Sequence, residues 1–260
     1  MTVTTMSTTA RQWGELWGDR PADWAANEEQ QTAVYERVLE EVHVGAGTRV
    51  LDAGCGTGVF LRLCADRGAR VDGLDASEGL LAVARRRVPE AALVQGDLQA
   101  LPYADESFDV VTGFASFFFA DDMVAALREA GRVARPGAPV VVEVFGAPER
   151  CDLELVKRAV APFRGGDAED RYWRPGATEE LVEQAGLAVR SSFDVVSEYV
   201  YPSAGALADA MLAAGGAAAV AGPAHEGELR DAIVRELAGC RQADGSYRLS
   251  NEWHVVIAGA

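Results

Sequence analysis

A short apolar strand that runs into three closely spaced glycines constrains the fold of this chain more than any other feature. Residues 49–59 read RVLDAGCGTGV, and Gly54, Gly56 and Gly58 stand at alternate positions. Glycines let the backbone approach a ligand that side chains would push away. A helix that opens after them points its free N–H groups at that ligand, which suits a polar or anionic group. The segment therefore predicts a buried strand, a ligand-binding turn and a helix.

The spacing of the glycines separates two kinds of turn. A dinucleotide-binding turn has glycine at its first, third and sixth positions. Here the fifth position is Gly58 and the sixth is Val59. Asp52 precedes the first glycine by two residues, and its carboxylate would repel a phosphate. The pattern disfavours a nicotinamide-dependent oxidoreductase, which stays as a third alternative for the function.

Length, charge and cysteine content limit the class of protein. The 260 residues suffice for one α/β domain with an attached cap. A formal net charge of -16 argues against a nucleic-acid partner, because phosphate contacts need a basic surface. The four cysteines form no CxxC pair, which is unlike a zinc site or a disulfide framework. No segment reads as a signal peptide or a membrane span, so we expect a cytoplasmic protein.

Strands and helices alternate between residues 48 and 146, a pattern typical of a parallel sheet with helices on both faces. The expected strands are 48–54, 69–76, 91–97, 107–114 and 138–146, and the helices between them are 57–67, 77–88 and 121–134. Beyond them we expect helices at 151–163, 178–186, 204–220 and 226–240, and strands at 188–200 and 251–258. We predict a single domain over residues 1–260. Its parts are an N-terminal helical cap (1–47), a cofactor-binding core (48–146), and cap helices with the C-terminal strands (147–260).

Acidic residues follow the second and third expected strands, where ligands of a parallel sheet collect. The carboxylate of Asp75 can accept two hydrogen bonds from a ribose diol, although it could instead cap the next helix. Asp97 could accept from an adenine amino group, and the Leu98 N–H could donate to the ring. The alternative for Asp97 is a solvent-facing turn residue.

Together these motifs resemble the class I S-adenosylmethionine-dependent methyltransferases, most closely the small-molecule branch that includes ubiquinone and menaquinone biosynthesis enzymes. The matching segments are 50–58, 73–77, 95–102, 107–111 and 127–138. The resemblance implies an α/β fold with a Rossmann-like, doubly wound, seven-stranded sheet, an antiparallel last strand and helical cap insertions. It also implies S-adenosylmethionine as the cofactor. The residues expected to hold it are Asp52, Gly54, Cys55, Gly56, Gly58, Asp75, Ala76, Asp97, Leu98 and Phe114. Cys55 is more typical of a small residue in a tight space than of a reactive thiol.

The implied activity is methyl transfer to a small organic acceptor such as a quinone, a polyketide or another secondary metabolite. We expect direct in-line displacement without a metal ion, no nucleic-acid or membrane partner, and a monomer or a homodimer. A second alternative keeps the fold and the bound S-adenosylmethionine but works as a cyclase, a decarboxylase or a binding scaffold, since fold does not determine activity.

Few residues are candidates for acid–base chemistry. Of the three histidines, His225 lies in the predicted cap near the expected substrate entrance, and it is the preferred general base over His43 and His254. Glu143 interrupts an apolar strand and is interpreted as a structural residue.

Aromatic residues could surround a sulfonium through cation–π contacts. The phenylalanines at 114 and 117–119 are candidates, of which at least two are expected to be ordinary packing. Trp24 could close over the methionine end of the cofactor, but an anchor for the N-terminal helix is the favoured interpretation. Tyr172 and Trp173 could form part of a lid.

Overall fold

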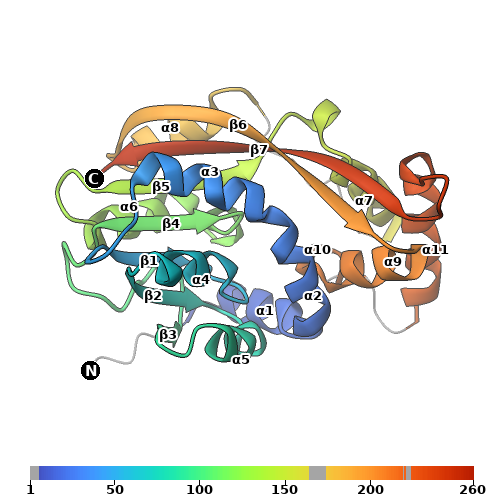
Figure 1. Cartoon of the computed structure of the whole chain (residues 1–260), viewed down its shortest axis with the longest axis horizontal. Helices are drawn as coiled ribbons and strands as arrows, with labels where there is room; N and C mark the ends of the chain where they lie inside the picture. The colour runs from blue at the N-terminus through green and yellow to red at the C-terminus, as the bar shows by residue number, and fades with distance from the viewer. Residues whose placement is uncertain (1–5, 164–173, 219, 221–223) are drawn as a thin grey trace.

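The computed structural model describes residues 6–163, 174–218, 220 and 224–260, and it contains a seven-stranded sheet in the order β3-β2-β1-β4-β5-β7-β6 (Figure 1). Neighbours from β3 to β5 run parallel, whereas β7 is antiparallel to both β5 and β6. The strands are β1 (Arg49–Ala53), β2 (Arg70–Asp75), β3 (Ala92–Gln95), β4 (Val110–Phe114), β5 (Pro139–Phe145), β6 (Ala188–Tyr201) and β7 (Tyr247–Gly259). The predicted fold class, with its reversed last strand, is confirmed.

Helices cover both faces of the sheet and form a cap at one end (Figure 1). Those packed on the sheet are α3 (Thr32–Val42), α4 (Val59–Asp66), α5 (Glu78–Arg87), α6 (Met123–Val133) and α8 (Ala177–Gln184). The remaining helices are α1 (Thr8–Trp17), α2 (Pro21–Glu28), α7 (Leu153–Val160), α9 (Ala204–Ala213), α10 (Gly215–Ala218) and α11 (Glu226–Glu236). In the described ranges, no helix has the length and apolar character needed to pass through a bilayer.

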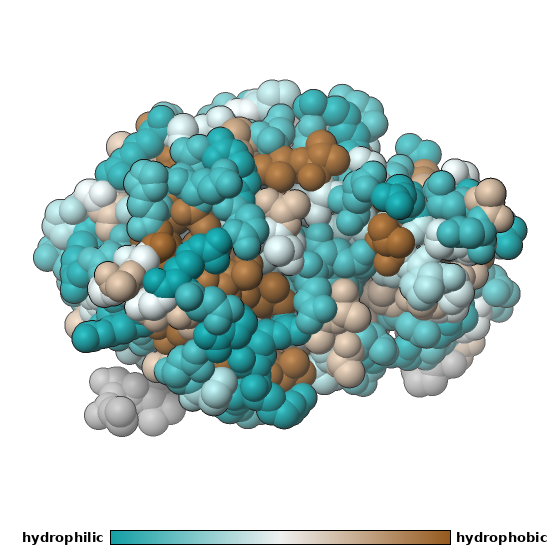
Figure 2. All heavy atoms as spheres, viewed as in Figure 1, coloured by the Kyte–Doolittle hydropathy of each residue, from teal (hydrophilic) through white to brown (hydrophobic). Residues whose placement is uncertain are grey.

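Alternation along the buried strands builds a core on each side of the sheet. Val50 and Val110 belong to the cluster that also contains the apolar residues of α3 and α4. Their neighbours Leu51 and Val111 belong to the cluster on the opposite face, with those of α6. Successive side chains of a strand point to opposite faces, so a continuous apolar run buries both. Hydrophilic residues cover most of the face in Figure 2, with hydrophobic ones gathered near the centre of the view.

Two long strands of the sheet extend into the cap. β6 and β7 have 14 and 13 residues, and they extend beyond the other strands toward α7, α9 and α11 (Figure 1). Helix α1 contacts both α5 and α10, and α2 contacts both α5 and α9. The N-terminal helices therefore join the sheet to the C-terminal cap.

Several element boundaries differ from the predicted ones. The helix expected over 204–220 breaks at Ala214, whose backbone is extended (ψ 126°), into α9 and α10. The break brings Gly215 against the indole of Trp17, where a Cβ would lie 2.6 Å from Nε1. This tertiary contact decides the conformation over local helix propensity. The last strand begins at Tyr247 rather than Asn251, because β6 pairs with it that far.

The glycine turn has the backbone conformation that its sequence predicts. Gly54, Gly56 and Gly58 have φ values of +87°, +53° and +81°, a region that residues with a Cβ rarely adopt. A Cβ on Gly54 would lie 2.3 Å from the Cβ of Ser116. Ser116 is anchored by its hydroxyl, which donates to the Ala53 carbonyl over 2.6 Å.

We expect Gly54→Ala to lower the free energy of unfolding by about 2–5 kcal/mol, from left-handed strain plus overpacking. Gly245→Ala is the matched control, because Gly245 has φ +88° and its nearest neighbour is the flexible Arg241 guanidinium at 3.7 Å. That substitution should cost about 1–2 kcal/mol, the strain alone. Urea unfolding measures both, and equal losses would show that the Ser116 contact is unimportant.

Candidate functional site

A cavity of about 490 Å³ opens at the carboxyl ends of β1, β2 and β4. Its floor is the glycine turn, and its walls come from α1, α2, the end of β5, the middle of β7, and α7 of the cap. Strand order reverses between β1 and β4, and open α/β sheets bind their ligands at such a switch point.

The structure brings the predicted cofactor residues together around this cavity. Those that line it are Asp52, Gly54, Cys55, Gly56, Asp75, Ala76, Asp97, Leu98 and Phe114. Gly58 does not line it. It directly precedes α4, and a Cβ there would lie 3.2 Å from the Cβ of Ala84, so Gly58 permits close packing of the start of α4 against α5.

The Asp75 carboxylate supports the glycine turn. One of its oxygens accepts from the Gly56 N–H over 2.9 Å, and the other from the Ser77 N–H over 2.8 Å. The cap of α5 is Ser77 itself, whose hydroxyl accepts from the Leu80 N–H. A carboxylate oxygen has two lone pairs, so both oxygens of Asp75 keep acceptor capacity for a ribose diol.

A second carboxyl group, that of Glu28, sits over the turn. Its oxygens accept from the Thr57 N–H over 2.8 Å and from the Val59 N–H over 3.4 Å, at the N-terminus of α4. A Cβ on Gly56 would lie 2.7 Å from Glu28 Oε2. Burial raises the pKa of Glu28 from 4.5 to about 7. The chain thus fills its own helix N-terminus with a carboxyl group.

Sequence reasoning missed Glu28, and no local signal marks it. It ends α2 in a polar run and meets the turn only through a contact about thirty positions along the chain. The glycine turn and the helix after it predicted a polar or anionic ligand group at this helix end, whereas the protein places its own acid there.

Asp52 completes an acidic group beneath the cavity. It accepts from the Thr112 hydroxyl over 2.7 Å and is 3% exposed. Burial, with Glu28 and Asp75 nearby, raises the pKa of Asp52 from 3.8 to about 8. Once ionised, these three carboxylates favour a cationic ligand and oppose a phosphate. The glycine turn, whose backbone lines the cavity, and the three acidic side chains therefore fit S-adenosylmethionine, which carries a positively charged sulfonium.

Asp97 ties the N-terminal segment to the sheet. Its carboxylate accepts from the Ser7 N–H over 2.9 Å and from the Gln99 N–H over 3.0 Å. Ser7 caps α1, so this contact holds α1 across the cavity. The Cys55 thiol is buried and its pKa is raised well above the usual range by that burial, which agrees with a space-filling role.

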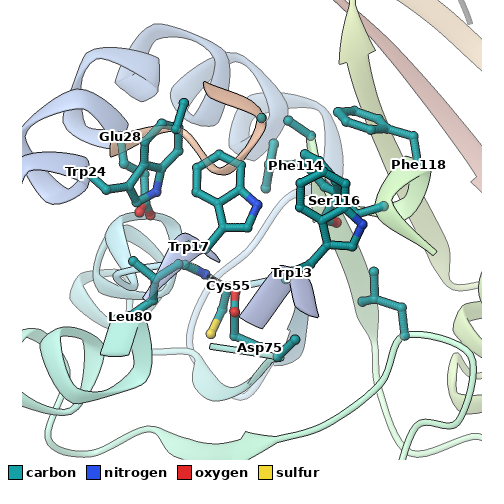
Figure 3. Close-up of a pocket in the computed structure, with 18 of the residues that line it drawn as sticks. Trp13, Trp17, Trp24, Glu28, Cys55, Asp75, Leu80, Phe114, Ser116 and Phe118 are labelled. Atoms are coloured by element: carbon teal, nitrogen blue, oxygen red, sulfur yellow. Dashed lines mark hydrogen bonds between the residues drawn. The ribbon is translucent and has the colours of Figure 1, made fainter. Parts of the chain in front are cut away.

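Three indoles stand in a row along the cavity: those of Trp13, Trp17 and Trp24 (Figure 3). Trp17 and Trp24 meet edge to face with centroids 4.5 Å apart, and Trp13 meets Phe119 at 4.7 Å. The sequence indicated only that this region is a helical cap. Trp24, expected as an anchor, lines the cavity.

The phenylalanines at the end of β4 and directly after it divide between the two roles considered for them. Phe114, Phe118 and Phe119 line the cavity, whereas Phe117 is 1% exposed in the core beside α6.

Other candidates lie away from the cavity. His225 precedes α11, its side chain is 58% exposed, and its imidazole lies 3.7 Å from Glu228. Glu143 is buried near the carboxyl end of β5, and neither carboxyl oxygen has a hydrogen-bond partner among the residues described. Tyr172 and Trp173 fall outside the described residues. Over those ranges, no group of three or more His, Cys, Asp or Glu side chains is arranged to hold a metal ion.

Comparison with known proteins places this geometry in a family. A methyltransferase-domain model matches residues 51–142. A malonyl-[acyl-carrier protein] O-methyltransferase of Serratia marcescens is 38% identical over 117 residues, 45% of this chain and 46% of the relative. A demethylmenaquinone methyltransferase of Renibacterium salmoninarum is 41% identical over 119 residues, 45% of this chain and 50% of the relative. The chain spans about half the length of these two curated relatives.

A longer match comes from Mycolicibacterium smegmatis. Its protein, named "Probable S-adenosylmethionine-dependent methyltransferase", is 33% identical over 185 residues, 69% of this chain and 68% of the relative. Among solved structures, a [4+2]-cyclase matches with a TM-score of 0.56 and 20% identity over 87% of this chain and 80% of its own. An S-adenosylmethionine-dependent methyltransferase from Aquifex aeolicus matches with a TM-score of 0.51 and 22% identity over 62% and 83%. These structural matches show a shared fold.

The sheet order and the glycine turn at its switch point define a Rossmann-like α/β protein with a ligand-binding turn. The match to the mycobacterial protein makes the assignment specific. The chain belongs to the S-adenosylmethionine-dependent methyltransferase family, and the expected family and cofactor are confirmed.

Proposed function

We propose that this chain transfers a methyl group from S-adenosylmethionine to a small organic acceptor by direct in-line displacement. The observation that supports this most directly is a cavity lined by buried acidic residues, the glycine turn and aromatic side chains. S-adenosylmethionine supplies an electrophilic methyl group on a positively charged sulfur, and transfer to a nucleophilic atom leaves a neutral sulfide.

The acidic residues would hold the cofactor by charge and hydrogen bonding. Asp75 has acceptor capacity for the ribose hydroxyls, and Asp97 with Leu98 lies where the adenine is expected. Glu28 and Asp52, which both line the cavity, would favour the positively charged end of the molecule.

The aromatic residues would shield the reaction from water and align the two substrates. Displacement from a sulfonium gains more from alignment and a dry site than from acid–base groups. Trp253 is 2% exposed and stacks on Phe145 with centroids 4.7 Å apart, so this wall of the cavity is largely aromatic. Such a wall suits a small organic acceptor, the class that the name demethylmenaquinone methyltransferase indicates for one relative.

Two measurements test the proposal. Calorimetry should detect binding of S-adenosylmethionine and S-adenosylhomocysteine but not of NADH, and the reverse preference would support an oxidoreductase. Incubation with a panel of quinones, phenols and polyketides should release S-adenosylhomocysteine with at least one of them. Cofactor binding with product formation but no such release would indicate a cyclase or decarboxylase instead.

The position of His225 argues against the role of general base that the sequence indicated. Because its imidazole is largely exposed and does not line the cavity, we expect His225→Ala to leave both cofactor affinity and turnover unchanged. Turnover is followed as S-adenosylhomocysteine release, with calorimetry of the cofactor as the control. Slower turnover at unchanged affinity would support His225 as the general base.

A further inference from the structure

The wall of the cavity opposite the glycine turn carries one positive charge. Helix α7 turns a stripe toward the cavity at the i, i+3, i+4, i+7 spacing of a helical face: Leu153, Val156, Lys157 and Val160. Lys157 is the chain's only lysine. It is also the only lysine or arginine among the described residues that line the cavity.

Lys157 is held in place by its neighbours. Its ammonium lies 2.6 Å from Glu154 Oε1 and 5.0 Å from the centroid of the Phe145 ring. The side chain is 28% exposed. An ammonium can donate to more than one acceptor, and Glu154 does not line the cavity. The cation is thus positioned at an aromatic surface that continues through Phe145 onto Trp253.

The rest of this wall is aromatic. Phe145 and Trp253 both line the cavity, and the indole Nε1–H of Trp253 is itself buried. This wall therefore presents an ammonium and aromatic rings, whereas the opposite side presents the carboxyl groups of Glu28, Asp52 and Asp75.

We infer that the acceptor is a flat aromatic molecule with a carboxylate group, and that Lys157 binds this carboxylate. The inference rests on the proposed function. An anionic group is repelled by the acidic side of the cavity and attracted to the ammonium. Binding there directs the opposite edge of the ring toward the glycine turn. The atom that receives the methyl group is then on that edge and is not the carboxylate itself.

Matched probes test this in the full-length protein loaded with S-adenosylhomocysteine. Titration calorimetry compares 2-naphthoate with 2-naphthamide, which has the same shape and no charge. A charge-assisted hydrogen bond contributes about 1.5–3 kcal/mol, so we expect the wild type to bind the anion at least about tenfold more tightly. Lys157→Met should remove this preference by weakening 2-naphthoate alone, and Lys157→Arg should retain most of it.

Arg158→Met is the control, because it removes a positive charge from the adjacent, exposed position of α7. It should leave the preference unchanged. The inference is overturned if the wild type binds both probes equally or neither, or if Arg158→Met has the same effect as Lys157→Met. Failure of the wild type to bind S-adenosylhomocysteine would instead overturn the proposed function.

Discussion

Replacing Asp75 with alanine is expected to weaken S-adenosylmethionine binding by about 1–3 kcal/mol, or roughly 5–150-fold in Kd. Two effects combine. The variant loses the acceptors proposed for the ribose diol, and it also leaves the Gly56 N–H and the Ser77 N–H without their carboxylate partner. The second effect loosens the turn on which the cofactor would lie. Calorimetry of the folded variant measures the loss.

Asp72→Ala is the matched control for this experiment. Asp72 lies on the same strand and pairs with Arg49 at 3.0 Å, but it does not line the cavity. Its loss should lower stability without changing cofactor affinity. Equal affinities for Asp75→Ala and the wild type would remove Asp75 from the site, whereas a loss shared with Asp72→Ala would trace the effect to stability.

Asp52→Asn is expected to become more stable relative to the wild type as the pH rises. The folded protein raises the pKa of Asp52 from 3.8 to about 8 through burial, so the wild type folds with a neutral carboxyl group. The protonated carboxyl group of Asp52 stabilises the fold fully at pH values below the pKa of Asp52 in the unfolded chain. This contribution is lost as the pH rises through the pKa of Asp52 in the folded protein. Between about pH 4 and about pH 9 the relative gain of Asp52→Asn should be on the order of 5 kcal/mol.

Urea unfolding of both proteins across this pH range measures the difference. A constant offset from the changed Thr112 hydrogen bond cancels in the comparison between pH values. Glu40→Gln serves as the control, since that side chain is 73% exposed and should show no pH-dependent difference. A flat difference for Asp52→Asn would show that Asp52 is ionised in the folded protein.

Local sequence was a good guide to the sheet. Apolar runs predicted the positions of β1 to β5, and the resemblance predicted the reversed β7. Helix starts were less predictable. The expected helix starts at residue 178, whereas α8 begins at Ala177 after Gly176, and the Thr178 hydroxyl is buried without a hydrogen-bond partner among the described residues. A side chain caps a helix only where the fold leaves it free to accept from the first backbone N–H groups. Here Gly176, in the left-handed region, occupies the cap position of α8 instead.

The sequence by itself determined the strand, the glycine turn and the strand-end acids, because each depends on backbone conformation within a few residues. Only the tertiary structure decided the other half of the cavity. Glu28 reaches the turn from an N-terminal helix, and Lys157 faces it from the cap. Burial and charge proximity depend on neighbours that folding brings together from distant positions, so neither side chain carries a local signal. The same packing decides the protonation of Asp52, which in an unfolded chain would be an ordinary acid.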